Sequence, residues 1–267
     1  MLNQDKHLLL KLSNIAIQAG IAIMEFYKTD FQVETKKDNT PITKADLAAN
    51  SIIIEELKKI DENIPILSEE SVVAWNKRKQ WEKYWLVDPL DGTKEFINKN
   101  GEFSVNIAMI EKNNPVIGII YAPAKSLLYF AKKNLGAFKL SSSSLLNNLD
   151  DAILIKTSNL EVKDNIRVIS SRSHSNFYFD TWVRKNFRKY ELVSRGSSLK
   201  FCEIAEGQAD IYPRFGPTSE WDIAAGHIIL EEAGGKINDL NGKNIFYNAK
   251  ENLINSDFIA SNGMNLI

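Results

Sequence analysis

The feature of this sequence that most constrains its fold is a short apolar strand that ends in two carboxylates. The segment Trp85-Leu-Val-Asp88-Pro-Leu-Asp91-Gly92-Thr93 places Asp88 and Asp91 three residues apart, on either side of a proline. Pro89 stiffens the turn, and Gly92 lets the backbone come close to a ligand, so both carboxylates can face a shared point. Read alone, the segment is also compatible with an ordinary acidic surface turn.

Two further acidic segments supply the context for this pair. Glu69 and Glu70 follow the apolar residues 64–67, and Asp222 opens a predicted helix in the segment Trp221-Asp222-Ile-Ala-Ala-Gly226. Adjacent acids on a loop are often a solvated surface, and an aspartate at a helix start can simply cap the first backbone amides. Capping and metal binding are compatible, because a capping aspartate is held rigidly.

The charge balance argues against a nucleic-acid polymer as partner. The chain carries 33 basic and 34 acidic residues, with no basic stripe that could follow a phosphate backbone. Its 267 residues, 44% of them hydrophobic, can bury a large core as one domain or as two packed halves. The single cysteine, Cys202, cannot form an internal disulfide, and the three histidines are scattered, so a reducing cytoplasm fits and a zinc site does not.

The N-terminus predicts a helix of the mature protein rather than a signal peptide. The apolar run at Leu8 to Leu10 is interrupted by Lys11 and Ser13, and no small-residue cleavage site follows. A run of roughly 18 apolar residues is absent, so we expect no membrane span. The expected location is the cytoplasm, with contact to the inner face of the membrane left open.

Hydrophobic periodicity predicts blocks of helix and strand in alternation. The first helix covers residues 5–28, and the second begins after Thr43, where Thr-Lys-Ala-Asp resembles a capping box. An antiparallel meander should follow, because apolar segments are separated by polar turns. The predicted strands are 84–87, 104–110, 116–121, 127–131 and 167–170, and the later helices are 176–187, 198–206 and 222–233.

A serine and asparagine run at 141–148 is the candidate loop between two halves. It divides the chain into an N-terminal α+β half, residues 1–150, and a C-terminal α/β half, residues 151–267. Trp221 and Cys202 are expected in the core rather than in a base-stacking or thiol chemistry.

The two acidic motifs together resemble a known family. Asp88-Pro-Leu-Asp91-Gly92-Thr93 and Trp221-Asp222-Ile-Ala-Ala-Gly226 are similar to the two signatures of the inositol monophosphatase family, in the same order, and the likeness covers nearly the whole chain. Within the family the chain is most similar to bacterial 3′(2′),5′-bisphosphate nucleotidases of the CysQ type. That likeness rests on Ser170-Ser-Arg-Ser-His174, Gly196-Ser-Ser-Leu-Lys-Phe-Cys-Glu-Ile-Ala-Glu-Gly-Gln-Ala-Asp210 and Tyr212-Pro-Arg-Phe-Gly-Pro-Thr218.

The resemblance implies a fold and a magnesium site. The fold would be α/β (α+β), a layered α-β-α-β-α sandwich of the inositol monophosphatase and sugar phosphatase type. Glu69, Asp88 and the backbone carbonyl of Leu90 would hold one ion, and Asp88, Asp91 and Asp222 a second, so that Asp88 bridges two Mg²⁺ ions; a third is left open. Carboxylates without neighbouring Cys or His suit this hard cation.

The resemblance also implies three catalytic residues. Thr93 would hold the attacking water, and Asp46 would accept a proton from this threonine, with a plain capping role for Asp46 as the alternative. Glu70 would lie just behind the metal ligands, or support the third ion.

The remaining implied contacts concern the substrate. Gly92 and Thr93 would face the reacting phosphate with backbone amides at a helix start. Lys200, Arg172 and His174 are candidates for a second phosphate, with a solvated lysine and an ordinary surface histidine as alternatives. The full predicted set of substrate contacts is Glu69, Leu90, Asp91, Gly92, Thr93, His174, Gly196, Lys200 and Asp222.

The implied reaction is magnesium-dependent, lithium-sensitive hydrolysis of adenosine 3′,5′-bisphosphate to AMP and phosphate, in sulfur assimilation, with the phosphosulfate PAPS as a further substrate. One alternative is a phosphatase for inositol 1-phosphate or a sugar bisphosphate. Another is an inactive nucleotide-binding sensor, which the presence of all four carboxylates disfavours. The sequence leaves the oligomeric state open.

Overall fold

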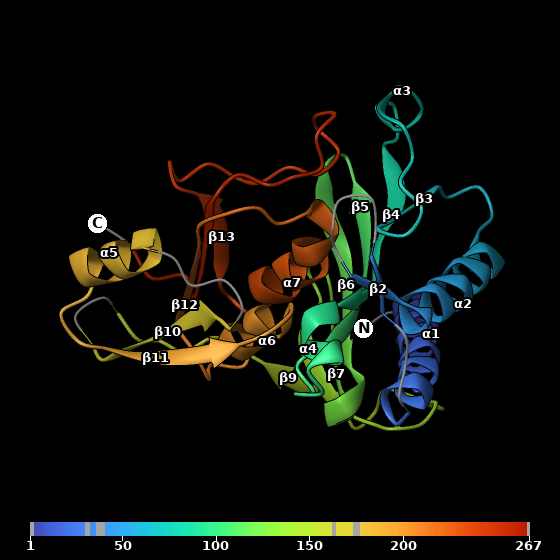
Figure 1. Cartoon of the computed structure of the whole chain (residues 1–267), viewed down its shortest axis with the longest axis horizontal. Coiled ribbons are helices and arrows are strands. Elements are labelled where there is room, and N and C mark those ends of the chain that lie inside the picture. Colours follow the sequence, from blue (N-terminus) through green and yellow to red (C-terminus); the bar gives the residue numbers. More distant parts are fainter. Residues whose placement is uncertain (1–2, 30–32, 36–40, 162–163, 173–176, 266–267) are drawn as a thin grey trace.

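The structure is a computed structural model that describes residues 3–29, 33–35, 41–161, 164–172 and 177–265. Helices and sheets alternate in layers across it (Figure 1). The helices α1 (Asn3–Tyr27) and α2 (Lys44–Ile60) cover one face of a seven-stranded sheet. The helices α6 (Leu199–Ala205) and α7 (Glu220–Glu232) lie between that sheet and a five-stranded sheet. Helix α5 packs on the outer face of the second sheet through Phe179 and Val183. The predicted layered sandwich is confirmed.

The first sheet is an antiparallel meander with one parallel strand at its edge. Its order is β3-β4-β5-β6-β7-β8-β9, and β3 pairs in parallel with β4. The meander was predicted; β3, β8 and β9 were not. The strands are β3 (Ile66–Ser68), β4 (Lys83–Asp91), β5 (Ser104–Glu111), β6 (Asn114–Ala122), β7 (Leu127–Lys132), β8 (Gly136–Ser141) and β9 (Ile153–Ile155).

The second sheet has the order β11-β10-β12-β14-β13, in which sequence neighbours are often not spatial neighbours. Only its strand β10 was predicted; β12, β13 and β14 have four residues each, too few to show a clear alternation. The strands are β10 (Ile166–Ser171), β11 (Tyr190–Arg195), β12 (Ile211–Arg214), β13 (Lys236–Asp239) and β14 (Phe258–Ser261), and β1 (Val33–Thr35) with β2 (Pro41–Thr43) forms a separate ribbon.

The predicted longer helices are all present. The capping box at Thr43 is confirmed, with Asp46 accepting from the Thr43 backbone N–H at 2.7 Å. The predicted boundary between halves at 150/151 stays a prediction, and β9 just beyond it pairs with β8. The helices are α1 (Asn3–Tyr27), α2 (Lys44–Ile60), α3 (Trp75–Arg78), α4 (Thr93–Ile97), α5 (Phe177–Asn186), α6 (Leu199–Ala205) and α7 (Glu220–Glu232), with a 3-10 turn at Pro123–Lys125.

Helix α1 is long and apolar. Within the described residues it is the one helix whose length and composition would allow it to cross a membrane, with a mean hydropathy of 1.4 over its most apolar stretch. Half of that stretch is buried inside the fold, and the helix packs on α2, β5 and β6. Core helices of soluble proteins commonly pass the same test.

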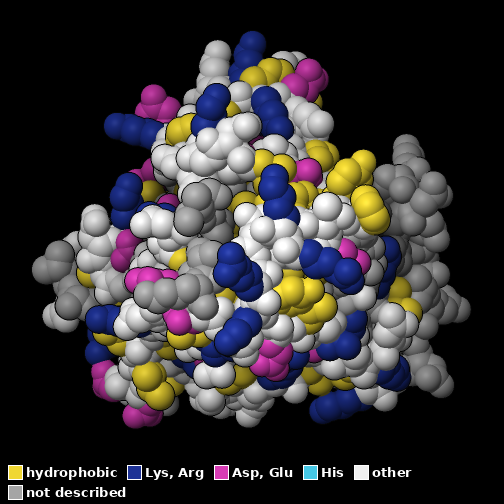
Figure 2. All heavy atoms as spheres, turned by 90° about the vertical axis from the view of Figure 1, so that its left-hand side faces the viewer, with side chains coloured by type: hydrophobic (Ala, Val, Ile, Leu, Met, Phe, Trp, Pro, Cys, Tyr) yellow, Lys and Arg dark blue, Asp and Glu magenta, His cyan; other side chains and the backbone are white. Residues whose placement is uncertain are grey.

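On the face that carries α5 and β11, basic, acidic and hydrophobic side chains are interspersed (Figure 2).

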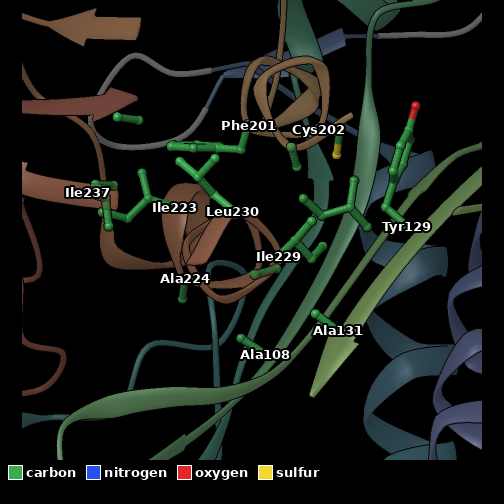
Figure 3. Packing of buried hydrophobic residues seen from close by; sticks show 14 of the residues in the cluster. Ala108, Tyr129, Ala131, Phe201, Cys202, Ile223, Ala224, Ile229, Leu230 and Ile237 are labelled. Atoms are coloured by element: carbon green, nitrogen blue, oxygen red, sulfur yellow. The ribbon is translucent and has the colours of Figure 1, made fainter. Parts of the chain in front are cut away.

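The core between the sheets depends on a close approach of α7 to the first sheet. Ala224 and Ile229 of α7 lie towards Ala108 and Ala131 of the first sheet, whereas Ile223 and Leu230 lie towards Phe201 and Ile237 (Figure 3). Small residues on the strands let the helix backbone come near, and this fixes α7, which carries Asp222 in its first turn.

Gly118 of β6 marks the tightest part of this contact. A Cβ at this position would lie 2.4 Å from the carbonyl oxygen of Ala225 and 2.5 Å from Ile228 Cγ2. We expect Gly118→Ala to destabilise the protein by about 1–3 kcal/mol, because helix backbone must shift to admit the methyl group. Urea unfolding measures this, with Ser143→Ala on an exposed loop as the control; equal midpoints for Gly118→Ala and the wild type would contradict the packing described.

Candidate active site

Two neighbouring strands of the first sheet, β3 and β4, bring three acidic residues together at their carboxyl ends. Asp88 and Asp91 lie at the end of β4, where the pairing with β5 shifts register between them. Glu69 directly follows β3, and its backbone N–H donates to the carbonyl of Val87 at 3.1 Å. Because β3 and β4 are parallel, their carboxyl ends meet, and this places the predicted acids of both segments together.

Asp222 reaches the same point from the other side, on the first turn of α7. One carboxylate oxygen from each of Asp88, Asp91 and Asp222 can be chosen so that all lie within 4.8 Å of one another. Asp222 also caps its helix, since its Oδ2 accepts from the Ser219 backbone N–H at 2.9 Å. The start of α7 is held in turn by Asn255, whose Nδ2 donates to the Ser219 carbonyl at 2.8 Å. Asp222 therefore both caps α7 and belongs to the acidic cluster.

The acidic cluster is electrostatically unfavourable without a cation. Asp88 is buried, and burial together with the charges of Glu69, Asp91 and Asp222 raises its pKa well above the usual range. Burial, together with the charges of Asp91 and Glu69, also raises the pKa of Asp222. A set of buried and half-buried oxygen ligands that repel one another suits a hard divalent ion, which would remove the repulsion.

Asp46 and Thr93 form a pair beside this cluster. Asp46 is buried at the start of α2; its Oδ2 serves the capping box and its Oδ1 lies 3.3 Å from Thr93 Oγ1. Thr93 Oγ1 also lies 3.2 Å from the carbonyl oxygen of Leu90. Gly92 precedes α4 with φ 88°, a left-handed conformation that favours glycine. The capping and threonine roles predicted as alternatives for Asp46 are structurally compatible.

The carboxylates line a cavity of about 260 Å³, and part of the wall of this cavity is cationic. Lys200 and Arg214 lie on that wall, each less than one-tenth exposed. The predicted residues Gly92, Thr93 and Gly196 also line it. Its complete lining is Glu69, Asp88, Leu90, Asp91, Gly92, Thr93, Lys94, Glu95, Ser171, Gly196, Ser197, Ser198, Lys200, Phe201, Tyr212, Arg214, Pro217, Thr218, Asp222 and Ile223.

Lys200 is not the solvated lysine that the sequence left open. Its Nζ donates to the Ser197 carbonyl and lies 5.4 Å from the centre of the Tyr212 ring. Burial lowers the pKa of Lys200, while the charges of Asp91 and other acids act in the opposite direction. The alternative of an outward lysine on α6 is therefore wrong.

Arg214 also lines the site, but the sequence interpretation did not single it out. Its Nη2 donates to the Pro217 carbonyl at 2.8 Å, whereas its buried Nε has no hydrogen-bond partner among the described residues. A buried, unsatisfied guanidinium N–H in a cavity wall suggests an anionic ligand. The only sequence signal was its place in the Tyr212-Pro-Arg-Phe-Gly segment, already noted for its family likeness.

Other predicted residues lie apart from the cavity lining. Arg172 forms a two-point ion pair with Glu102, at 2.8 and 2.9 Å, and Glu102 also accepts from the Gly196 backbone N–H. Glu70 follows Glu69 without lining the cavity, and its catalytic role stays a prediction. His174 lies outside the described residues. Cys202 is buried, as expected.

Comparison with known proteins places this site in a family. Residues 5–265 match the model of the inositol monophosphatase family. The chain is 42% identical to the 3′(2′),5′-bisphosphate nucleotidase CysQ of Salmonella typhimurium, over 93% of this chain and 97% of that protein. It is 40% identical to the protein of the same name from Escherichia coli K12, over 94% and 98% of the two chains.

A solved structure supports the same placement. The crystal structure of CysQ from Bacteroides thetaiotaomicron, a bacterial member of the inositol monophosphatase family, matches with a TM-score of 0.85 and 38% identity, covering 96% of this chain and 97% of that one. The fold, the acidic cluster and these relatives agree: this chain belongs to the inositol monophosphatase family.

Proposed function

We propose that this chain is a magnesium-dependent phosphatase that hydrolyses adenosine 3′,5′-bisphosphate to AMP and phosphate. The observation that carries the proposal is a cavity with two charge signs, lined by buried and half-buried carboxylates and by the buried cations Lys200 and Arg214. A monophosphate needs only the metal side, whereas a second phosphate gives the cationic wall a partner. The CysQ relatives named above support the same substrate class.

The donor set fits the metal that the proposal requires. Asp88, Asp91 and Asp222 offer converging oxygens, and Glu69 lines the same cavity wall. Glu69, Asp88 and the Leu90 carbonyl would hold one Mg²⁺, and the three aspartates a second. When bound, such a pair lowers the pKa of a water molecule and offsets negative charge on the phosphate oxygens.

The protein's own groups then position the reactants. Thr93 Oγ1 lies 3.3 Å from Asp46 Oδ1. The hydroxyl oxygen can accept a hydrogen bond from a water molecule while the hydroxyl proton is donated in a hydrogen bond to that carboxylate. Gly92, in its left-handed conformation, brings the backbone at the start of α4 to the cavity wall. Lys200 and Arg214 would hold the phosphate that is not cleaved and so orient the one that is.

Phosphate release from a matched panel of substrates tests the proposal. The panel contains adenosine 3′,5′-bisphosphate, PAPS, inositol 1-phosphate and fructose 1,6-bisphosphate, each assayed with Mg²⁺ and after chelation. We expect the highest kcat/KM for adenosine 3′,5′-bisphosphate and no turnover after chelation. A higher kcat/KM for inositol 1-phosphate would overturn the substrate assignment, and nucleotide binding without any phosphate release would indicate the silent sensor instead.

A further inference from the structure

Asp91 is held by a set of buried polar groups that the proposed chemistry does not use. It receives hydrogen bonds from Ser197 Oγ at 2.8 Å, from Asn106 Nδ2 at 3.4 Å and from the backbone N–H of Ser198. Among the described residues, all of these end on Oδ2. The other oxygen, Oδ1, is thereby left for a cation.

Behind these donors lies Ser104, which is fully buried on β5. Ser104 pairs across the sheet with Asp91, and Asn106 pairs with Asp88, so alternate residues of β5 face the loop 196–198. Ser104 Oγ lies 2.5 Å from Ser197 Oγ and 2.8 Å from Ser198 Oγ.

Counting protons gives these contacts a direction. A carboxylate only accepts, so Ser197 must donate its single hydroxyl proton to Asp91. The single proton of Ser104 is also within reach of Asn106 Oδ1 at 3.0 Å, but the shorter contact with Ser197 needs it, because Ser197 has no second proton. Asn106 Oδ1 lies 2.8 Å from Ser198 Oγ, and this contact turns the amide so that Nδ2 faces Asp91. The chain of hydroxyl groups therefore ends on the metal-facing carboxylate.

The backbone supports the same interpretation. Ser197 has φ 57°, a left-handed conformation that a residue with a side chain rarely adopts and that the surroundings must stabilise. Its hydroxyl contacts with Ser104 and Asp91 supply that stabilisation. Loss of Ser104 would therefore release both the Ser197 hydroxyl and the turn that aims Ser198 N–H at Asp91.

We propose that Ser104 and Asn106 are positioning residues that fix the orientation of Asp91 for divalent-cation binding. The inference rests on the proposed function, since it assumes that Asp91 is a metal ligand. Neither of these two strand residues lines the cavity, so both would act through Asp91.

Titration calorimetry with Mg²⁺ alone tests the proposal on Ser104→Ala and Asn106→Leu. Removing groups that orient a metal ligand typically costs 10–100-fold in metal affinity, so we expect the Kd for Mg²⁺ to rise by roughly tenfold in each variant. The Mg²⁺ concentration for half-maximal activity should rise in parallel, while KM for the nucleotide at saturating Mg²⁺ stays within about twofold. The double variant should show less than the product of the single effects, because both act through one carboxylate.

Ser13→Ala is the matched control. Ser13 is equally buried, lies on α1, and its Oγ has no hydrogen-bond partner among the described residues. It should leave the Kd for Mg²⁺ unchanged. Wild-type protein that neither binds Mg²⁺ nor needs it would overturn the proposed function, whereas wild-type affinity in both Ser104→Ala and Asn106→Leu would overturn this inference alone.

Discussion

Asp88→Asn should abolish activity and at the same time make the metal-free protein more stable. Asp88 is buried between Glu69, Asp91 and Asp222, so replacing its carboxylate with an amide of the same shape removes mutual repulsion. It also removes the one ligand proposed to bridge both ions. We expect kcat to fall by at least ~10³-fold, which corresponds to about 4 kcal/mol of lost transition-state stabilisation.

Thermal unfolding in a chelator measures the second effect. Each kcal/mol of relieved repulsion should raise Tm by roughly 2–4 °C for a chain of this size. Asp151→Asn, at an exposed position, should change neither activity nor Tm. Loss of activity with a lower Tm in chelator would indicate general damage to the fold rather than removal of a charge from a cation site.

The acidic half of the site could be predicted because its information is local. Asp88, Asp91, Pro89 and Gly92 lie within five positions of one another, and a strand followed by a turn leaves few ways to place two carboxylates. Joining them to Asp222, more than a hundred residues away, required the family resemblance. The strand alone does not say what lies opposite its end.

The cationic half depends on tertiary structure that no local pattern shows. Arg214 ends β12, a strand of four buried residues that contains Pro213 and lies between β10 and β14. A proline usually argues against an inner strand, and a strand buried on both faces does not alternate. No strand was therefore predicted here, and the Arg214 side chain that lines the cavity was not singled out.

Lys200 and Ser104 show a related limit. The sequence left Lys200 open between solvent and ligand, because a seven-residue helix has no clear polar face; its burial follows from the packing of α6 beside Tyr212. Ser104 reads as an ordinary member of a predicted strand. Its contact with Ser197 joins residues 93 positions apart, which only the convergence of the two sheets creates.

Arg214→Met should convert a bisphosphatase into an enzyme that scarcely distinguishes a bisphosphate from a monophosphate. Methionine keeps the length and apolar stem of the side chain while removing the guanidinium whose Nε lacks a partner. Losing a buried charged contact to a ligand costs about 2–4 kcal/mol, so kcat/KM for adenosine 3′,5′-bisphosphate should fall by roughly 30-fold to 10³-fold. For 3′-AMP, which lacks the second phosphate, it should change by less than about threefold.

The ratio of the two kcat/KM values separates a contact with the second phosphate from a contact with the reacting one. Because the proposed Mg²⁺ ligands are acidic groups and Arg214 is not among them, the Mg²⁺ concentration for half-maximal activity should stay unchanged in this variant. Arg188→Met, at an exposed position, controls for the loss of one positive charge from the protein as a whole. An equal fall for both substrates would mean that Arg214 stabilises the shared phosphate or the fold, and the second-phosphate role would pass to Lys200 or to residues outside the cavity wall described.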